Sequence, residues 1–220
     1  QYSGHIIFDH VSFGLSSRER IGLIGRNGHG KTTLFRLLIG QEQCDEGTIK
    51  IPRDYRIGYL SQHILFTRPT VLEEGCCGLQ ESQKEQEWKV KKILSGLGYS
   101  ESDFGRNPSE FSGGYQIRLN LTKVLVSEPN LLLLDEPTNF LDIISIRWLT
   151  SFLNSWQNEI MIISHDRSFM DSVTTHILGI HRSKIKKIRG STKDYYDKIS
   201  QEEEIYEKER TNEEKKRKQV

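Results

Sequence analysis

The sequence has few cysteines and no long apolar run. Its three cysteines, Cys44, Cys76 and Cys77, are odd in number and two are adjacent. Because this spacing does not suit a disulfide framework, we expect a reducing, cytoplasmic compartment. There is no run of about 18 apolar residues, and the N-terminus lacks the basic and then apolar pattern of a secretory signal. We therefore expect a chain that does not insert into a membrane and carries no export address.

A strong charge of one sign is also missing. The 31 Lys and Arg residues nearly balance the 30 Asp and Glu residues, which leaves a formal net charge of +1. No global field favours nucleic acid or an anionic membrane, so such a partner would have to meet a local patch. The 220 residues, 35% hydrophobic and 28% charged, are typical of a globular chain with a real core. Because Gln1 is not an initiator Met and the end is highly charged, we expect a piece of a longer protein.

The apolar pattern predicts an α/β fold. Short strands are expected within residues 6–24, 47–51 and 56–60, and longer buried strands at 131–134 and 160–163. Helices are expected at 31–39, in a polar insertion over 69–97, and at 114–126 and 141–153. Buried strands that alternate with helices indicate a parallel sheet covered on both faces.

A glycine-rich segment follows the apolar strand 21–24 and opens the helix at 31. Its residues are Gly25, Arg26, Asn27, Gly28, His29, Gly30, Lys31, Thr32 and Thr33. The first eight fit the phosphate-loop pattern, in which glycines let backbone N–H groups surround phosphates, Lys31 neutralises the β and γ oxygens and Thr32 holds Mg²⁺. The alternative is a glycine turn that binds nothing, which the strand and helix on either side disfavour.

Two carboxylates stand at the end of the buried strand 131–134. Ligands of open α/β sheets bind at the carboxyl ends of strands, where Asp135 and Glu136 lie. Asp135 would reach Mg²⁺, directly or through water, and Glu136 is placed to polarise an attacking water. Taken alone, the pair could also be exposed acids that cap a strand.

His165 follows the second buried strand. If strand 160–163 neighbours strand 131–134, His165 lies on the same sheet edge as Asp135 and Lys31 and could contact a γ-phosphate. A single histidine after a strand is more often structural, and the other six histidines have that interpretation.

Small residues also precede the helix at 114–126. Ser112, Gly113 and Gly114, followed by Tyr115, leave free N–H groups that can form an anion site. Simple helix capping is the alternative for these residues.

Taken in order, these motifs resemble the ABC ATPase family along nearly the whole chain. Residues 25–33 match its first nucleotide motif, Gln62 its Q-loop, 111–115 its signature, 131–136 its second motif, 139–142 its D-loop and 163–166 its switch histidine. The resemblance implies a P-loop NTPase of ABC type, with a mixed sheet core, an antiparallel β-subdomain and a small helical subdomain at about 66–127. It implies one nucleotide-binding domain over 1–190.

The resemblance also implies ATP and Mg²⁺ as cofactors. Glu136, His165 and Gln62 would be catalytic, and Thr32, Gln62 and Asp135 would hold the metal. Residues 25–33 would contact the nucleotide bound by this domain. Residues Ser112 to Tyr115 would contact the nucleotide bound by a second ABC domain that pairs head to tail with it. Tyr2 looks like the aromatic that stacks on adenine in this family, although a core or edge aromatic is the other interpretation.

Within the family, the chain resembles the ABC-F branch. The features are EPTNFLD at 136–142, Tyr115 where transporters usually have Gln, and SHDRSF at 164–169. Branch members carry two such domains and act mainly at the ribosome, so residues 191–220 would begin the charged helical linker between domains. The branch often has His where Phe140 stands, small residues at His29 and Leu at Phe111, but none of these changes removes the lysine, a metal ligand or the catalytic carboxylate.

Two functions of different class remain open at this point. One is a translation factor that meets the ribosome, its RNA and transfer RNA, in which the basic run 215–218 would contact phosphates or be a solvated helix face. The other is the motor subunit of a membrane transporter, disfavoured by the long charged helix that leaves the domain. A regulatory protein that holds ATP without cleaving it is disfavoured by the presence of Glu136 and His165.

Overall fold

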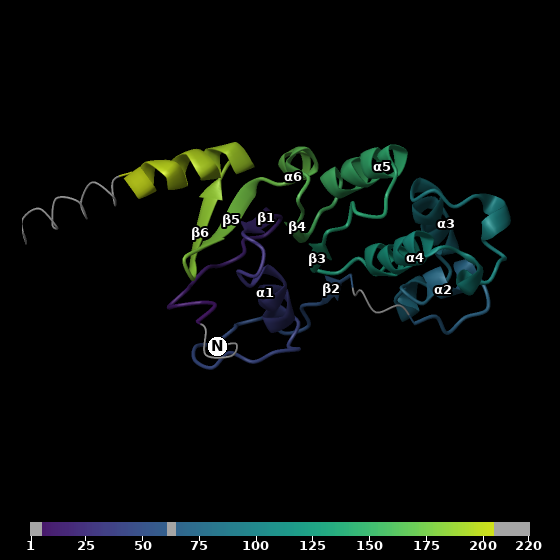
Figure 1. The fold of residues 1–220 in the computed structure, drawn as a ribbon. Coiled ribbons are helices and arrows are strands. Elements are labelled where there is room, and N and C mark those ends of the chain that lie inside the picture. Colours follow the sequence, from purple (N-terminus) through teal and green to yellow (C-terminus); the bar gives the residue numbers. More distant parts are fainter. Residues whose placement is uncertain (1–5, 61–64, 205–220) are drawn as a thin grey trace, which may run out of the picture.

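Six strands form one mixed sheet at the centre of the molecule (Figure 1). The computed structural model describes residues 6–60 and 65–204. The strands are β1 (Arg20–Gly25), β2 (Ile57–Tyr59), β3 (Leu131–Asp135), β4 (Glu159–Ile163), β5 (His176–His181) and β6 (Lys184–Arg189). They lie in the order β2-β3-β4-β1-β5-β6, and every neighbouring pair is parallel except β5 and β6. The α/β fold with a mixed sheet is confirmed.

Helices cover the sheet and also form a separate group at one end of the molecule. They are α1 (Lys31–Leu38), α2 (Val71–Cys76), α3 (Glu87–Gly96), α4 (Gly113–Val126), α5 (Ile143–Asn154) and α6 (Arg167–Val173). Helices α2, α3 and α4 pack together at one end of the molecule, and a further helix at 192–204 lies at the other end, beyond β6 (Figure 1). Within residues 6–60 and 65–204, none of the helices combines the length and apolar character needed to cross a membrane.

The alternation of side chains along β3 separates two cores. Successive residues of a strand point to opposite faces of its sheet. Leu131 and Leu133 belong to a core that includes Phe35 of α1, whereas Leu132 and Leu134 belong to a core that includes Leu119 of α4. All four leucines are at most 2% exposed, as the continuous apolar run predicts for a strand covered on both faces.

The first sixty residues contain fewer strands than the sequence predicts. Residues 6–13 and 47–51 are not strands in the structure. A strand forms only where a neighbour completes a ladder of backbone hydrogen bonds, and the described backbone bond of segment 6–13 is the single donation from Asp9 N–H to Ser183 O. Antiparallel pairing lies instead between β5 and β6, which were not predicted.

Candidate functional site

The ends of three neighbouring strands meet at one edge of the sheet. Gly22 of β1 and Leu134 of β3 both lie opposite Ile162 of the strand between them, β4. The segments that follow these strands therefore leave the sheet side by side. The sequence placed His165 on the same edge as Asp135 and Lys31 only if β4 lies next to β3. The structure confirms that these two strands are neighbours.

Lys31 reaches back over the glycine-rich loop at this edge. Its Nζ donates to Gly25 O at 2.8 Å and to Arg26 O at 3.3 Å, and lies 3.5 Å from Asn27 Oδ1. Burial lowers the pKa of Lys31, and Glu136 and Asp135 oppose that shift. The amine is thus held at the mouth of the loop by neutral oxygens, and a phosphate could replace them as a better partner.

The loop has a backbone that only glycine adopts readily. Gly28 has φ 80°, and Gly30, immediately before α1, has φ 91°. A side chain at Gly30 would also place its Cβ 2.3 Å from Ile7 Cγ2. These two glycines therefore bring the loop to the start of α1 in a conformation that other residues rarely adopt.

Thr32 and Asp135 join the loop to the end of β3. The Thr32 hydroxyl donates to Asp135 Oδ2 at 3.0 Å. Burial raises the pKa of Asp135, while the Thr32 hydrogen bond and Lys31 oppose that rise. A hydroxyl and a carboxylate side by side match the oxygen ligands that Mg²⁺ takes together with substrate phosphates. Among the described residues there is no cluster of three His, Cys, Asp or Glu side chains that could hold a metal alone.

Glu136 occupies a strained and enclosed position after β3. Its φ is 50°, its N–H donates to Ile163 O at 2.9 Å, and its side chain is 18% exposed. Oε2 accepts from the His165 N–H at 3.2 Å, whereas Oε1 is buried without a hydrogen bond. Burial raises the pKa of Glu136, and the His165 N–H opposes that rise. Oε1 is therefore a buried acceptor whose hydrogen-bonding capacity is unused.

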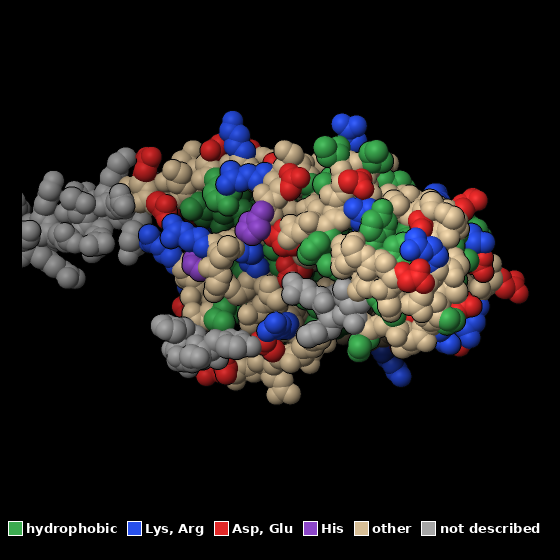
Figure 2. Space-filling model, turned by 45° about the vertical axis from the view of Figure 1, so that its right-hand side comes forward, with side chains coloured by type: hydrophobic (Ala, Val, Ile, Leu, Met, Phe, Trp, Pro, Cys, Tyr) green, Lys and Arg blue, Asp and Glu red, His purple; other side chains and the backbone are tan. Residues whose placement is uncertain are grey.

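His165 faces Glu136 from the end of β4. Its Nε2 lies 3.4 Å from Glu136 Oε1, a close approach that does not meet hydrogen-bond geometry, and its side chain is 68% exposed. Asp166 then caps α6 by accepting from the Phe169 N–H at 3.0 Å. In the space-filling view, a histidine lies close to acidic and basic side chains near the middle of the face shown (Figure 2).

Ser112, Gly113 and Gly114 lie apart from this edge, at the start of α4. The Ser112 side chain makes no capping hydrogen bond, so the capping alternative does not apply to its hydroxyl. Ser112 and Gly113 are exposed, and within the described part of the chain no hydrogen bond or ion pair joins this segment to Lys31 or Glu136. The segment is therefore an open surface with unused donors.

Tyr115 packs within its own region. Its ring lies 5.1 Å from Tyr99 and 5.8 Å from Phe111 between centroids, and the Arg118 guanidinium lies 4.7 Å from its centre. Its carbonyl accepts from the Tyr99 hydroxyl at 2.6 Å. These contacts give Tyr115 a structural role in holding the start of α4.

Arg118 of α4 connects its own helix to the segment that follows Glu136, and sequence reasoning missed it. Its guanidinium donates to Phe140 O at 2.9 Å, to Leu97 O at 2.9 Å and to Asp142 Oδ2 at 3.2 Å. Asp142 in turn caps α5 through the Ser145 N–H at 2.8 Å. The one signal in the sequence is a cation beside the apolar residues of α4, which alone does not name its partners.

Two predicted site residues, Tyr2 and Gln62, lie outside the described residues. The same holds for the basic run 215–218 and most of the expected linker, of which the structure describes 191–204. The remaining predicted residues fall into two groups, the sheet edge and the start of α4.

A family model described as ABC transporter matches residues 8–139. The chain belongs to the ABC ATPase family. The predicted family is therefore confirmed.

Curated relatives place this ABC domain near the F branch. The energy-dependent translational throttle protein EttA of Escherichia coli is 36% identical over 198 residues, which cover 88% of this chain and 36% of EttA. ABC transporter F family member 5 of Arabidopsis thaliana is 31% identical over 238 residues, which cover 88% of this chain and 34% of that protein. The chain thus spans about a third of the length of the relatives that it matches.

A solved structure supports the fold of the ABC domain. The dimeric bacterial ABC transporter cassette MJ0796 superposes with a TM-score of 0.70 at 18% identity, covering 83% of this chain and 90% of that chain. At this identity the likeness concerns the fold alone.

Proposed function

We propose that this ABC domain binds Mg·ATP at the edge formed by β1, β3 and β4 and hydrolyses it after pairing head to tail with a second ABC domain. The observation that carries the proposal is the buried Oε1 of Glu136, which accepts no hydrogen bond and faces His165 Nε2 at 3.4 Å, at the same edge as Lys31 and the Thr32–Asp135 pair. An enclosed acceptor beside a phosphate-binding amine suits the positioning of a water for attack on a γ-phosphate.

The residues of the chain have separate parts in this mechanism. The loop 25–33 surrounds the phosphates with backbone N–H groups, and Lys31 exchanges its carbonyl partners for β and γ oxygens. Glu136 Oε1 would orient the water and accept its proton. His165, whose Nε2 lies 3.4 Å from that oxygen, would contact the γ-phosphate. Thr32 and Asp135 would hold Mg²⁺, which neutralises phosphate charge when bound. Gln62 and Tyr2 are assigned to the metal and the adenine by resemblance only.

The second domain supplies what the sheet edge lacks. Ser112, Gly113 and Gly114 present exposed donors at a helix start, which would face the triphosphate bound by the partner. The dimeric form of MJ0796 supports this arrangement, and the partner would be another domain of the same parent chain or a second copy.

The organisation of the parent protein follows from the same proposal. Residues 1–190 would form the nucleotide-binding domain, with the helical subdomain at about 66–127, and 191–220 would begin the linker to a second domain. The helix at 192–204 and the lengths of the relatives support that reading. The name of EttA, a translational throttle protein, supports a role in translation. The proposal extends this role to a cytoplasmic protein that meets the ribosome, with ribosomal RNA or transfer RNA as partners.

The test uses the full-length parent protein carrying Glu136→Gln and the same change in any second domain. Retained ATP and stable co-sedimentation with ribosomes only in the presence of ATP are the expected results. ATP binding without any association with ribosomes would instead favour the motor subunit of a membrane transporter. A protein that binds no ATP would contradict the proposal itself.

A further inference from the structure

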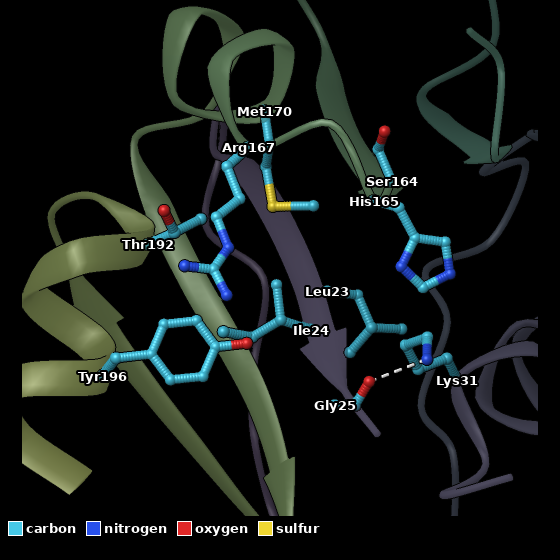
Figure 3. A pocket seen from close by; sticks show the side chains of 10 residues that line it. All are labelled: Leu23, Ile24, Gly25, Lys31, Ser164, His165, Arg167, Met170, Thr192 and Tyr196. Carbon is cyan, nitrogen blue, oxygen red and sulfur yellow. Dashed lines mark hydrogen bonds between the residues drawn. The ribbon is translucent and has the colours of Figure 1, made fainter. Parts of the chain in front are cut away.

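A polar pocket of about 140 Å³ lies beyond the γ-phosphate side of the site, between the end of β1, α6 and the helix at 192–204. Lys31 and His165 line one side, and Arg167 and Tyr196 line the other, with Ile24 between them (Figure 3). It therefore shares two residues with the proposed hydrolytic site and extends away from it. Arg167 and Tyr196 have no part in the chemistry described so far.

The charged side chains that line this pocket have one sign. Among the described residues that line it, none is acidic, whereas Lys31 and Arg167 are cations. Within the described chain, Arg167 has no carboxylate partner, and its guanidinium stacks on Tyr196 at 4.7 Å from the ring centre. An arginine that is positioned by an aromatic ring and has no carboxylate partner keeps its donors available for an anion.

The size of the pocket limits the ligand. A drug-sized or nucleotide-sized ligand occupies about 300 Å³ or more, well above the 140 Å³ found here. A single tetrahedral oxyanion fits, and its oxygens could meet the Arg167 guanidinium. The Tyr196 hydroxyl, which makes no described hydrogen bond, adds a donor on the Arg167 side.

We propose that this pocket is a binding site for inorganic phosphate, the product that leaves the γ position. The inference rests on the proposed function, because hydrolysis of ATP by water supplies the phosphate and leaves ADP in the loop. No bond changes when the phosphate moves: it exchanges contacts with Lys31 and His165 for contacts with Arg167. Arg167 is thus a product-binding residue at the start of α6.

The experiment is a calorimetric titration of inorganic phosphate into the full-length protein. It is carried out once with protein saturated with Mg·ADP and once with protein free of nucleotide. Arg167→Gln is expected to weaken phosphate binding by about tenfold or more, because a charge-assisted donor is lost, while ADP affinity stays within about twofold. Arg167→Lys should recover part of the affinity. The matched control is Arg147→Gln, at an exposed arginine of α5 that lies outside the pocket and should leave phosphate binding unchanged.

Tyr196→Glu provides a second test if Arg167→Gln does not fold. Tyr196 is 43% exposed, so the change is tolerated, and the new carboxylate would repel phosphate and pair with Arg167. Equal phosphate affinity in wild type and variants, or no phosphate binding by the wild type, would overturn the pocket assignment. Failure of the wild type to bind ADP would overturn the proposed function instead, while the nucleotide-free titration would still test the pocket.

Discussion

The sheet edge and the start of α4 differ in how completely one chain builds them. At the edge, Lys31, Thr32, Asp135 and Glu136 already contact one another or the backbone around them. At the start of α4, the Ser112 hydroxyl has no partner within its own helix cap. A region whose side chains are already positioned by contacts within one chain can bind alone, whereas one with exposed, unused donors needs a second surface. The comparison predicts that binding of ATP belongs to one domain and fast hydrolysis to two.

The largest effect should come from Glu136→Gln at the sheet edge. We expect turnover to fall by about 10²–10⁴-fold, because the amide keeps the shape of the side chain but cannot accept a proton. ATP affinity should stay within about twofold. Steady-state hydrolysis and equilibrium binding of ATP measure the two quantities. Glu73→Gln, the same change at an exposed glutamate of α2, is the control, and equal losses in the two variants would contradict the role of Glu136.

A carboxylate at the start of α4 should separate the two regions. Gly114→Asp is expected to reduce hydrolysis by paired domains about 10²–10³-fold, since a negative charge would face the triphosphate of the partner. A Cβ at this position has no neighbour closer than Phe140 Cβ, at 3.8 Å, so the fold and ATP binding by one domain should be unchanged.

The control for this variant is Gly105→Asp, at an exposed glycine with nothing within 4 Å of an added Cβ. Hydrolysis is measured over a range of protein concentrations, and monomer binding is measured separately. Loss of ATP binding in the isolated Gly114→Asp domain would show that the start of α4 serves its own chain.

Arg118 makes the connection between the regions, so its removal should lower stability. Arg118→Met would leave the carbonyl of Leu97, in a buried hydrogen bond, and the part-buried carbonyl of Phe140 without this donor, and we expect the free energy of unfolding to fall by about 2 kcal/mol. Urea denaturation of the nucleotide-free protein measures this. Arg147→Met on the exposed face of α5 should change stability by less than about 0.5 kcal/mol. A similar small change at Arg118 would mean that the two regions are held together by apolar packing instead.

The sequence predicts the edge better than the connections. Lys31 and Asp135 were located because a loop pattern and a buried run each specify local geometry, and His165 followed once β4 was placed beside β3. The contacts of Arg118 and Arg167 join residues of different elements, and no local pattern encodes such partners. Their discovery required the packing of helices on the sheet.

The hairpin of β5 and β6 was missed for a specific reason. Its turn residues, Arg182 and Ser183, have φ of 49° and 61°, a conformation for which Asn-Gly is the usual signal. Conversely, residues 6–13 and 47–51 alternate as strands do, but alternation does not supply the neighbour that a strand needs. Pairing between strands is a property of the whole fold.

The smallest expected effect is a change in the free energy of unfolding of the nucleotide-free protein, and its direction is what the experiment tests. Burial raises the pKa of Glu136, so its contribution is favourable below the ordinary pKa of a glutamate and is lost as pH rises through the raised value. Glu136→Gln should therefore increase the free energy of unfolding at neutral pH, by about 1 kcal/mol or less. Between neutral pH and mild acid, the difference from wild type should shrink.

Asp142, on the side of Arg118, should behave in the opposite way. The Ser145 N–H lowers the pKa of Asp142 against the effect of burial, and Arg118 lowers it further. Its contribution is therefore present above the ordinary pKa of an aspartate and lost as pH falls through the lowered value. Asp142→Asn should destabilise the protein at neutral pH, where Glu136→Gln stabilises it. Denaturation curves for both variants at several pH values measure these changes in the free energy of unfolding. If both substitutions change it in the same direction at neutral pH, the negative charge of Glu136 does not destabilise the fold. A site built for a cationic ligand would show the opposite signs.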